Sequence, residues 1–324
     1  MQYQKKLQII DANILYLIGA VLLFTIGSYF QHLSLKSGLI ITQYILILMP
    51  PIIYMLVRKI PIQSTMRLNK LKIKHGILIV FITLLMYPTA VFGNALFMTI
   101  LSLLGNLNIP ELPTATDTRE YVVLLMIISI SAGICEEVFF RGFILPGYEK
   151  LGTRKAIIIS SILFGVFHFN LYNLVGPIVL GLVFSYLVIL TNSLYAGIIG
   201  HIVNNGFAVT LGFLLNRFSE LPEENYETAV EISTTTALFI NVVIFGLLAI
   251  GAAFIASKLI NIIKKDMKKE KNILKLNNFH EEGSKYEEEI KDSISFTEYI
   301  PLVLMIPLYL FVAFMQLKEI ISLG

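Results

Sequence analysis

Long apolar runs, separated by short polar stretches, make up most of the chain. Nine runs can be counted, and most are long enough for a helix that crosses a bilayer, which needs about 20 apolar residues. They cover residues 11–31, 38–57, 76–104, 120–145, 155–169, 173–190, 194–216, 235–262 and 299–321. The pattern predicts an all-α polytopic transmembrane helix bundle of about eight to nine spans.

The charges in the connections predict which ends of the runs share a side of the membrane. Basic residues are concentrated in four connections, which are residues 1–11, 58–74, 148–155 and the start of 258–296. Two connections are acidic, residues 105–119 and 217–232. Because cytoplasmic loops carry the excess of lysine and arginine, we expect nine crossings with the N-terminus in the cytoplasm and the C-terminus outside.

Composition narrows the class of protein further. With 324 residues, 56% hydrophobic, 15% charged and a mean hydropathy of +0.76, the chain is too apolar for a soluble globule. We expect a multi-pass protein of the bacterial plasma membrane in contact with lipid, and nothing suggests nucleic acid as a partner. The sole cysteine, Cys135, excludes an intramolecular disulfide and a multi-cysteine metal site. The first run lacks a small-residue cleavage site, so it is predicted to be a retained span.

Two adjacent carboxylates and an arginine interrupt the fourth run. An ionised side chain facing lipid costs about 2.5–3.5 kcal/mol, so Glu136, Glu137 and Arg141 must face protein or water. Glu137 and Arg141 stand four apart and share one helical face, which predicts a neutralising pair. Glu136 points about 100° away and is therefore predicted to be the carboxylate left free for chemistry. A helix that simply ends in interfacial water would explain the same charges.

Two histidines lie in later apolar runs, His168 in the fifth and His201 early in the seventh. His201 and Asn205 are four apart and share a helical face, whereas Asn204 points elsewhere and is expected to hydrogen-bond between helices. Intramembrane ionisable groups mark functional sites by default, although a single membrane histidine often only packs between helices.

The turn between the fourth and fifth runs predicts where these groups lie in depth. With that turn at Gly152, Glu136 and His168 are each 16 residues away, so in an antiparallel hairpin they reach the same level. A break at Pro146–Gly147 would let this hairpin project far enough into the cytoplasm for His201 to join them. The site would then lie in the cytoplasmic half of the bilayer.

Such a cluster fits peptide hydrolysis. Glu136 would act as the general base on a water that His168 helps to hold, and His201 and Asn205 would donate to the oxyanion. A second arrangement places zinc between Glu136, His168 and His201, since zinc accepts nitrogen and oxygen ligands. These residues alone leave the choice open. Cys135 is disfavoured as a nucleophile because a buried thiol stays protonated and inert.

The ordered set of motifs resembles the signature of a known family. Glu136-Glu137-x-x-x-Arg141, Phe164-x-x-x-His168 and His201-x-x-x-Asn205 are similar to the motifs of the CPBP family, also called Abi. This group comprises CAAX prenyl endopeptidases and bacteriocin-processing or immunity proteins, and the resemblance covers roughly residues 120–210. It implies that Glu136 is the catalytic glutamate and that His168 activates the water. It also implies that His201 and Asn205 form the oxyanion hole, with Glu137 and Arg141 as a supporting pair. It also implies a glutamate-dependent mechanism without a metal cofactor.

Together these observations predict an intramembrane endopeptidase that acts on a peptide or lipidated protein. Its parts would be N-terminal helices, a catalytic core of four helices and C-terminal helices, at residues 1–119, 120–216 and 217–324. The charged segment 263–297 would be a solvated cytoplasmic linker or a contact for anionic lipids. The alternatives are a non-catalytic immunity or regulatory protein of the same fold and a proton-coupled transporter. Substrate identity, the need for prenylation and the oligomeric state stay open.

Overall fold

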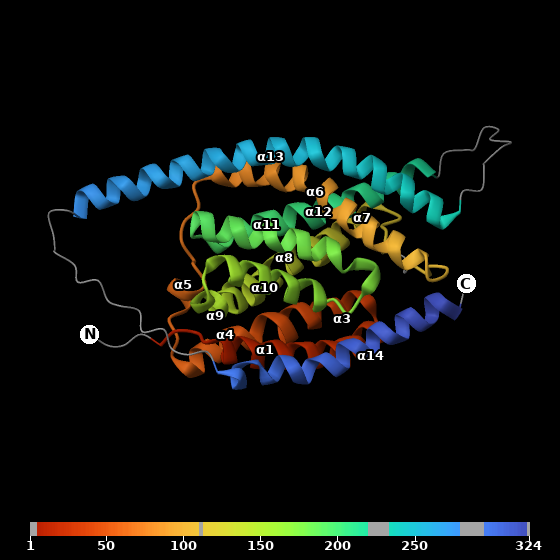
Figure 1. Ribbon diagram of the computed structural model, residues 1–324, viewed down its shortest axis with the longest axis horizontal. Coiled ribbons are helices and arrows are strands. Elements are labelled where there is room, and N and C mark those ends of the chain that lie inside the picture. The colour runs from red at the N-terminus through yellow and green to blue at the C-terminus, as the bar shows by residue number, and fades with distance from the viewer. Residues whose placement is uncertain (1–4, 110–112, 220–232, 279–294, 323–324) are drawn as a thin grey trace.

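The computed structural model describes residues 5–109, 113–219, 233–278 and 295–322, and every regular element in these ranges is helical. Eight helical stretches in the described ranges are long and apolar enough to cross a membrane. They run side by side along the long axis of the molecule (Figure 1). The chain is therefore a multi-pass integral membrane protein, and the predicted all-α bundle is confirmed.

The eight stretches are Ile9–Leu33, Leu35–Arg58, Ile73–Ser102, Thr118–Leu151, Leu171–Thr191, Leu194–Phe218, Thr234–Glu270 and Phe296–Ser322. The α-helices within and between them are α1 (Ile9–Leu22), α2 (Ser28–Leu33), α3 (Leu35–Ile41), α4 (Met49–Arg58), α5 (Ile62–Thr65), α6 (Ile73–Ser102), α7 (Thr118–Leu124), α8 (Ala132–Phe139), α9 (Leu145–Tyr148), α10 (Thr153–Val166), α11 (Val175–Thr191), α12 (Leu194–Ser219), α13 (Thr234–Asn278) and α14 (Ile300–Ser322).

Short π-helical segments interrupt three of the eight stretches. They are η1 (Leu23–Gly27) in the first, η2 (Thr42–Leu48) in the second, and η3 (Leu125–Ser131) and η4 (Phe140–Ile144) in the fourth. Three 3-10 turns complete the chain, η5 (Glu149–Leu151), η6 (Leu171–Asn173) and η7 (Phe296–Tyr299). Because a π-turn adds a residue to the helical repeat, it changes which side chains share a face, and such turns are frequent at functional sites.

The fifth apolar run forms a shorter helix than the sequence predicts. α10 has 14 residues, or about 21 Å, which is less than the roughly 30 Å of a hydrocarbon core. The prediction that the run stays helical through His168 is wrong, because α10 ends at Val166 and Phe169 takes a left-handed conformation with φ of +50°. The chain still turns at Gly152, as predicted, and the positive φ of +94° there suits glycine.

The predicted break at Pro146–Gly147 is wrong. The helical stretch continues to Leu151, because Pro146 lies in the first turn of α9, directly after the π-helical η4. A proline in a first turn lacks an N–H that the helix does not need, so it is tolerated there.

The basic connections meet at one end of the bundle. Ion pairs join them there at 2.5–2.8 Å, namely Arg67–Glu149, Lys74–Asp266, Lys150–Glu298 and Lys72–Glu270. At the opposite end Lys36 pairs with Glu120, and Asn108 donates to Glu319. The predicted grouping of the connections is thus present, while the side that faces the cytoplasm stays a prediction. Residues 110–112, 220–232 and 279–294, with most of the acidic connections, lie outside the described ranges.

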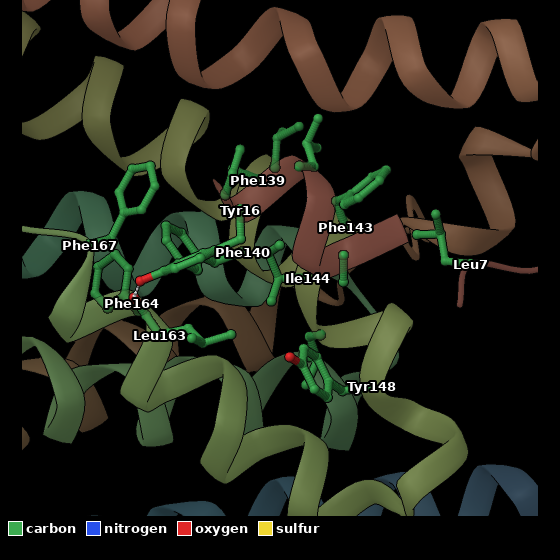
Figure 2. Packing of buried hydrophobic residues seen from close by; sticks show 14 of the residues in the cluster. Leu7, Tyr16, Phe139, Phe140, Phe143, Ile144, Tyr148, Leu163, Phe164 and Phe167 are labelled. Carbon is green, nitrogen blue, oxygen red and sulfur yellow. Dashed lines mark hydrogen bonds between the residues drawn. The ribbon is translucent and has the colours of Figure 1, made fainter. Parts of the chain in front are cut away.

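An aromatic core fixes the position of α8 (Figure 2). Tyr16 of α1 packs edge-on against Phe140, and its hydroxyl donates to the carbonyl of Leu163 in α10 at 2.9 Å. Phe139 and Phe140 are fully buried against Phe167. Since lipid tails are as apolar as these rings, close packing rather than escape from water holds such helices together. The core therefore gives the polar residues of α8 a rigid support.

Candidate active site

Glu137 and Arg141 form the ion pair that their spacing predicts. The Arg141 guanidinium lies 2.7 Å from Glu137 Oε1, and both side chains are 0% exposed. The remaining nitrogens of Arg141 donate to Ser185 Oγ and to the Gly181 carbonyl of α11, each at 3.3 Å. The guanidinium also lies 4.5 Å over the Phe164 ring. Several partners thus compensate this buried charge, as a charge removed from water requires.

His201 of α12 is held by Glu137 and by two aromatic rings. Its Nδ1 lies 2.9 Å from Glu137 Oε1, which is the oxygen that Arg141 also contacts. Phe184 stacks on the imidazole at 5.6 Å, and Phe164 meets it edge-on at 5.7 Å. A carboxylate at one ring nitrogen fixes the orientation of the ring. As a result Nε2, the other nitrogen, faces Glu136.

Glu136 differs from Glu137 in exposure and in partners. Its side chain is 14% exposed, and Oε2 lies 3.9 Å from His201 Nε2. Its other oxygen, Oε1, accepts a hydrogen bond of 2.8 Å from Gln43 Nε2 in η2. Two adjacent glutamates therefore occupy a closed and a partly open environment, as the helical spacing predicts. The catalytic role of Glu136 stays a prediction.

His168 lies in the turn after α10 and is exposed. Its Nδ1 lies 2.8 Å from the Phe164 carbonyl, and its ring meets the edge of Phe164 at 5.1 Å. His168 and His201 thus contact the same phenylalanine ring. No hydrogen bond or ion pair joins His168 to Glu136 in the part of the chain that the structure describes.

Asn205, rather than Asn204, makes the hydrogen bond to a neighbouring helix. Asn205 Nδ2 donates to the Ile128 carbonyl of η3 at 2.9 Å, while Asn204 Nδ2 donates to Asn205 Oδ1 and to no other described residue. The expectation that Asn204 joins two helices is therefore wrong. The physical reason is the rotation of α12 about its axis, which turns the Asn205 amide toward η3.

The described residues offer no ready site for a metal ion. Zinc needs three or four donors at about 2.0–2.3 Å around one point. Within the described ranges, no group of three or more His, Cys, Asp or Glu side chains is placed to hold a metal. As placed, Glu136, His168 and His201 do not form the zinc site that is the alternative from sequence.

Residues 118–207 match a protein family described as type II CAAX prenyl endopeptidase Rce1-like. The segment is similar to that family and is called the Rce1-like segment. It contains all seven residues named in the three motifs, so the resemblance read from the motifs is confirmed. The chain is also 34% identical over 97 residues to a Bacillus subtilis (strain 168) protein named "Putative membrane peptidase YdiL". That match covers 29% of the chain and 40% of the relative, so the chain spans less than half of the relative's length. No solved structure matches the chain.

Two glutamines from outside the Rce1-like segment also reach the site, and sequence reasoning missed both. Gln43 donates a hydrogen bond to Glu136. Gln316 of α14 binds the backbone beside His168: its Nε2 donates to the Phe169 carbonyl at 2.8 Å, and its Oε1 accepts from the Leu171 N–H at 2.8 Å. A signal for them exists, because both amides interrupt apolar runs in which polar side chains are costly. The runs themselves do not show which neighbour each amide contacts.

Proposed function

We propose that this chain is an intramembrane endopeptidase in which Glu136 activates a water for attack on a peptide bond. The observation that carries the proposal is the separation of the two glutamates. Glu137 is 0% exposed and bound by Arg141 and His201, whereas Glu136 is 14% exposed, accepts a hydrogen bond from the Gln43 amide and lies 3.9 Å from His201. Of the two carboxylates, Glu136 is therefore the one that water can reach and that has no arginine partner among the described residues.

In the proposed reaction, Glu136 Oε2 takes a proton from the water, and the water oxygen bonds to the carbonyl carbon of the substrate. The carbonyl oxygen becomes an oxyanion, which His201 Nε2–H and the second N–H of Asn205 Nδ2 stabilise. Glu137 holds the His201 ring in this orientation through Nδ1. Glu136 then passes its proton to the amide nitrogen, and the C–N bond breaks to give a carboxylic acid and an amine.

His168 is assigned a role in holding the water, as the motif resemblance implies. Its bond to the Phe164 carbonyl uses Nδ1, so Nε2 is the nitrogen left for a water. In the proposed reaction, the turn after α10 closes toward Glu136 so that His168 reaches the water. Catalytic hydrogen bonds are often long before substrate binds, so this arrangement is compatible with the assignment.

The substrate class we propose is a peptide or a lipidated protein tail. Its support is the description of the family that residues 118–207 match, which names a prenyl endopeptidase. The substrate would approach from the end where the basic connections meet, which the distribution of lysine and arginine assigns to the cytoplasm.

Quenched fluorescent peptides, with and without a prenyl group, would test this proposal on the full-length chain in detergent or liposomes. We expect Glu136→Gln to lower the cleavage rate by about 10²- to 10⁴-fold without lowering the melting temperature. Glu120→Gln, a glutamate at the opposite end, is the matched control and should keep the rate. A chelator should leave cleavage unchanged. Cleavage that survives Glu136→Gln would refute the assignment, and a proton flux lost in that variant without any proteolysis would favour a transporter.

A further inference from the structure

We propose that two glutamines from outside the Rce1-like segment, Gln43 and Gln316, are positioning residues for this site. Gln43 would orient the carboxylate of Glu136, and Gln316 would hold the turn that carries His168. The inference rests on the proposed function. It gives the second and the last span a role in the reaction, although neither contains a motif residue.

Gln43 determines which oxygen of Glu136 is available. Its Nε2 donates to Oε1 at 2.8 Å, and Oε2 remains as the oxygen nearest to His201. A donor on one carboxylate oxygen limits rotation of the group. The next residue, Tyr44, contacts Ser131 at 3.1 Å, which docks η2 against the helix that carries Glu136.

The other end of the Gln43 amide is unfavourable for stability. Gln43 is 7% exposed, and its Oε1 is buried without a hydrogen-bond partner among the described residues. A buried carbonyl without a partner destabilises a fold, whereas an apolar side chain of similar shape does not. The bond to Glu136 is the one gain that this glutamine brings to the described part of the chain.

Gln316 uses both ends of its amide on the turn after α10. Its Nε2 donates to the Phe169 carbonyl and its Oε1 accepts from the Leu171 N–H, each at 2.8 Å. Phe169 follows His168 directly and has φ of +50°, a conformation that an aromatic residue rarely adopts. Such strain persists only where the surroundings hold it, and the paired bonds from α14 do so.

Replacing Gln43 tests the first half of the proposal. Gln43→Met should lower kcat about 10- to 100-fold, because a misplaced catalytic group costs rate, while the melting temperature stays equal or rises. Gln31→Met is the matched control, since Gln31 is also a span glutamine and bonds Thr42 at 3.1 Å. Its kcat should stay unchanged. Unchanged kcat in Gln43→Met, or a loss that only accompanies a lower melting temperature, would overturn this half.

Gln43→Glu adds a readout that a purely structural role would not move. At acidic pH the new carboxyl group and Glu136 share one proton, so the donor persists and cleavage continues. As pH rises the shared proton is lost and two carboxylates repel each other, so activity falls at lower pH than in wild type. A pH profile that matches wild type would count against Gln43 as the residue that positions Glu136.

Rescue by glycine tests the second half. Gln316→Met should lower kcat about 10- to 100-fold because the turn with His168 is released. Phe169→Gly in the same chain should restore much of the rate, because glycine adopts positive φ without strain. Full activity in Gln316→Met, or no recovery with Phe169→Gly, would overturn it. Glu136→Gln, assayed alongside, distinguishes failure of this inference from failure of the proposed function. If Glu136→Gln is inactive while the Gln43 and Gln316 variants keep the wild-type rate, only this inference is refuted. If Glu136→Gln is active, the proposed function is refuted.

Discussion

Adjacent residues of α8 occupy two regions of opposite character. On one side, Glu137 is closed in by Arg141, His201 and the backbone of α12 at Gly197. On the other side, Glu136 keeps 14% of its side chain exposed, and its partners among the described residues are the Gln43 amide at 2.8 Å and His201 at 3.9 Å. The comparison teaches that surroundings, not residue type, decide which of two identical carboxylates supports structure and which can meet a water.

The same substitution at both positions gives the largest expected difference. Glu137→Gln should lower the free energy of unfolding by about 3–5 kcal/mol, because it leaves the buried Arg141 without a counter-charge. Glu136→Gln should leave it nearly unchanged. Thermal or denaturant unfolding in detergent measures both. If the two variants lose equal stability, the contrast between a structural and a reactive glutamate fails.

A double variant sharpens that result. Glu137→Leu with Arg141→Leu removes both charges, and well-packed apolar residues are often as stable as a buried pair. We therefore expect the double variant to recover part of the stability that Glu137→Gln loses. A double variant less stable than Glu137→Gln would show that the partners of Arg141 in α11 matter more than its charge balance.

Replacing Asn205 tests whether the open region around Glu136 includes residues of α12. Asn205→Ala should lower kcat about 10²- to 10³-fold if its amide serves the oxyanion, and cost about 1 kcal/mol of stability through the lost bond to Ile128. Asn108→Ala is the control, since Asn108 bonds Glu319 at the opposite end. A loss of stability with an unchanged rate would confine Asn205 to helix pairing.

Part of this arrangement follows from local sequence rules. The Glu137–Arg141 pair lies within one helical stretch, so spacing alone predicts it, and the turn at Gly152 follows from a residue that accepts positive φ. The bonds from Gln43 and His201 join helices far apart in the sequence. An apolar run predicts a span but not the rotation of that span about its axis. The partners of Gln43 and His201 therefore follow only from the three-dimensional structure.

The π-helical segments account for a further failure of prediction. A face count at 3.6 residues per turn assumes a regular helix, and η3 and η4 break that repeat on both sides of α8. The helical stretch continues through η4 and past Pro146, where a break was expected. Neither π-segment has a composition that marks it in the sequence.

Gly197 tests how tightly the closed side is packed. A Cβ at Gly197 would overlap Glu137 Oε2, so Gly197→Ala should cost about 1–3 kcal/mol of stability and disturb His201 as well. Gly251→Ala in α13 is the matched control, because nothing lies within 4 Å of its Cβ position. That control should be neutral or stabilising by up to about 1 kcal/mol, since alanine favours helix. Equal stability of both variants would mean that the closed side can expand.

Replacing Cys135 has the smallest expected effect. The replacement tests whether the reactive side of α8 includes Cys135. It is the other neighbour of Glu136, is 0% exposed and lies within the aromatic core cluster. A buried free cysteine behaves as a small apolar side chain, so Cys135→Ala should keep the cleavage rate within about twofold and cost about 1 kcal/mol of stability at most. Thiol alkylation of the folded protein should likewise leave the rate unchanged. A tenfold loss of rate at wild-type stability would place chemistry on Cys135 as well as on Glu136, and the division of α8 into one closed and one open side would then have to be redrawn.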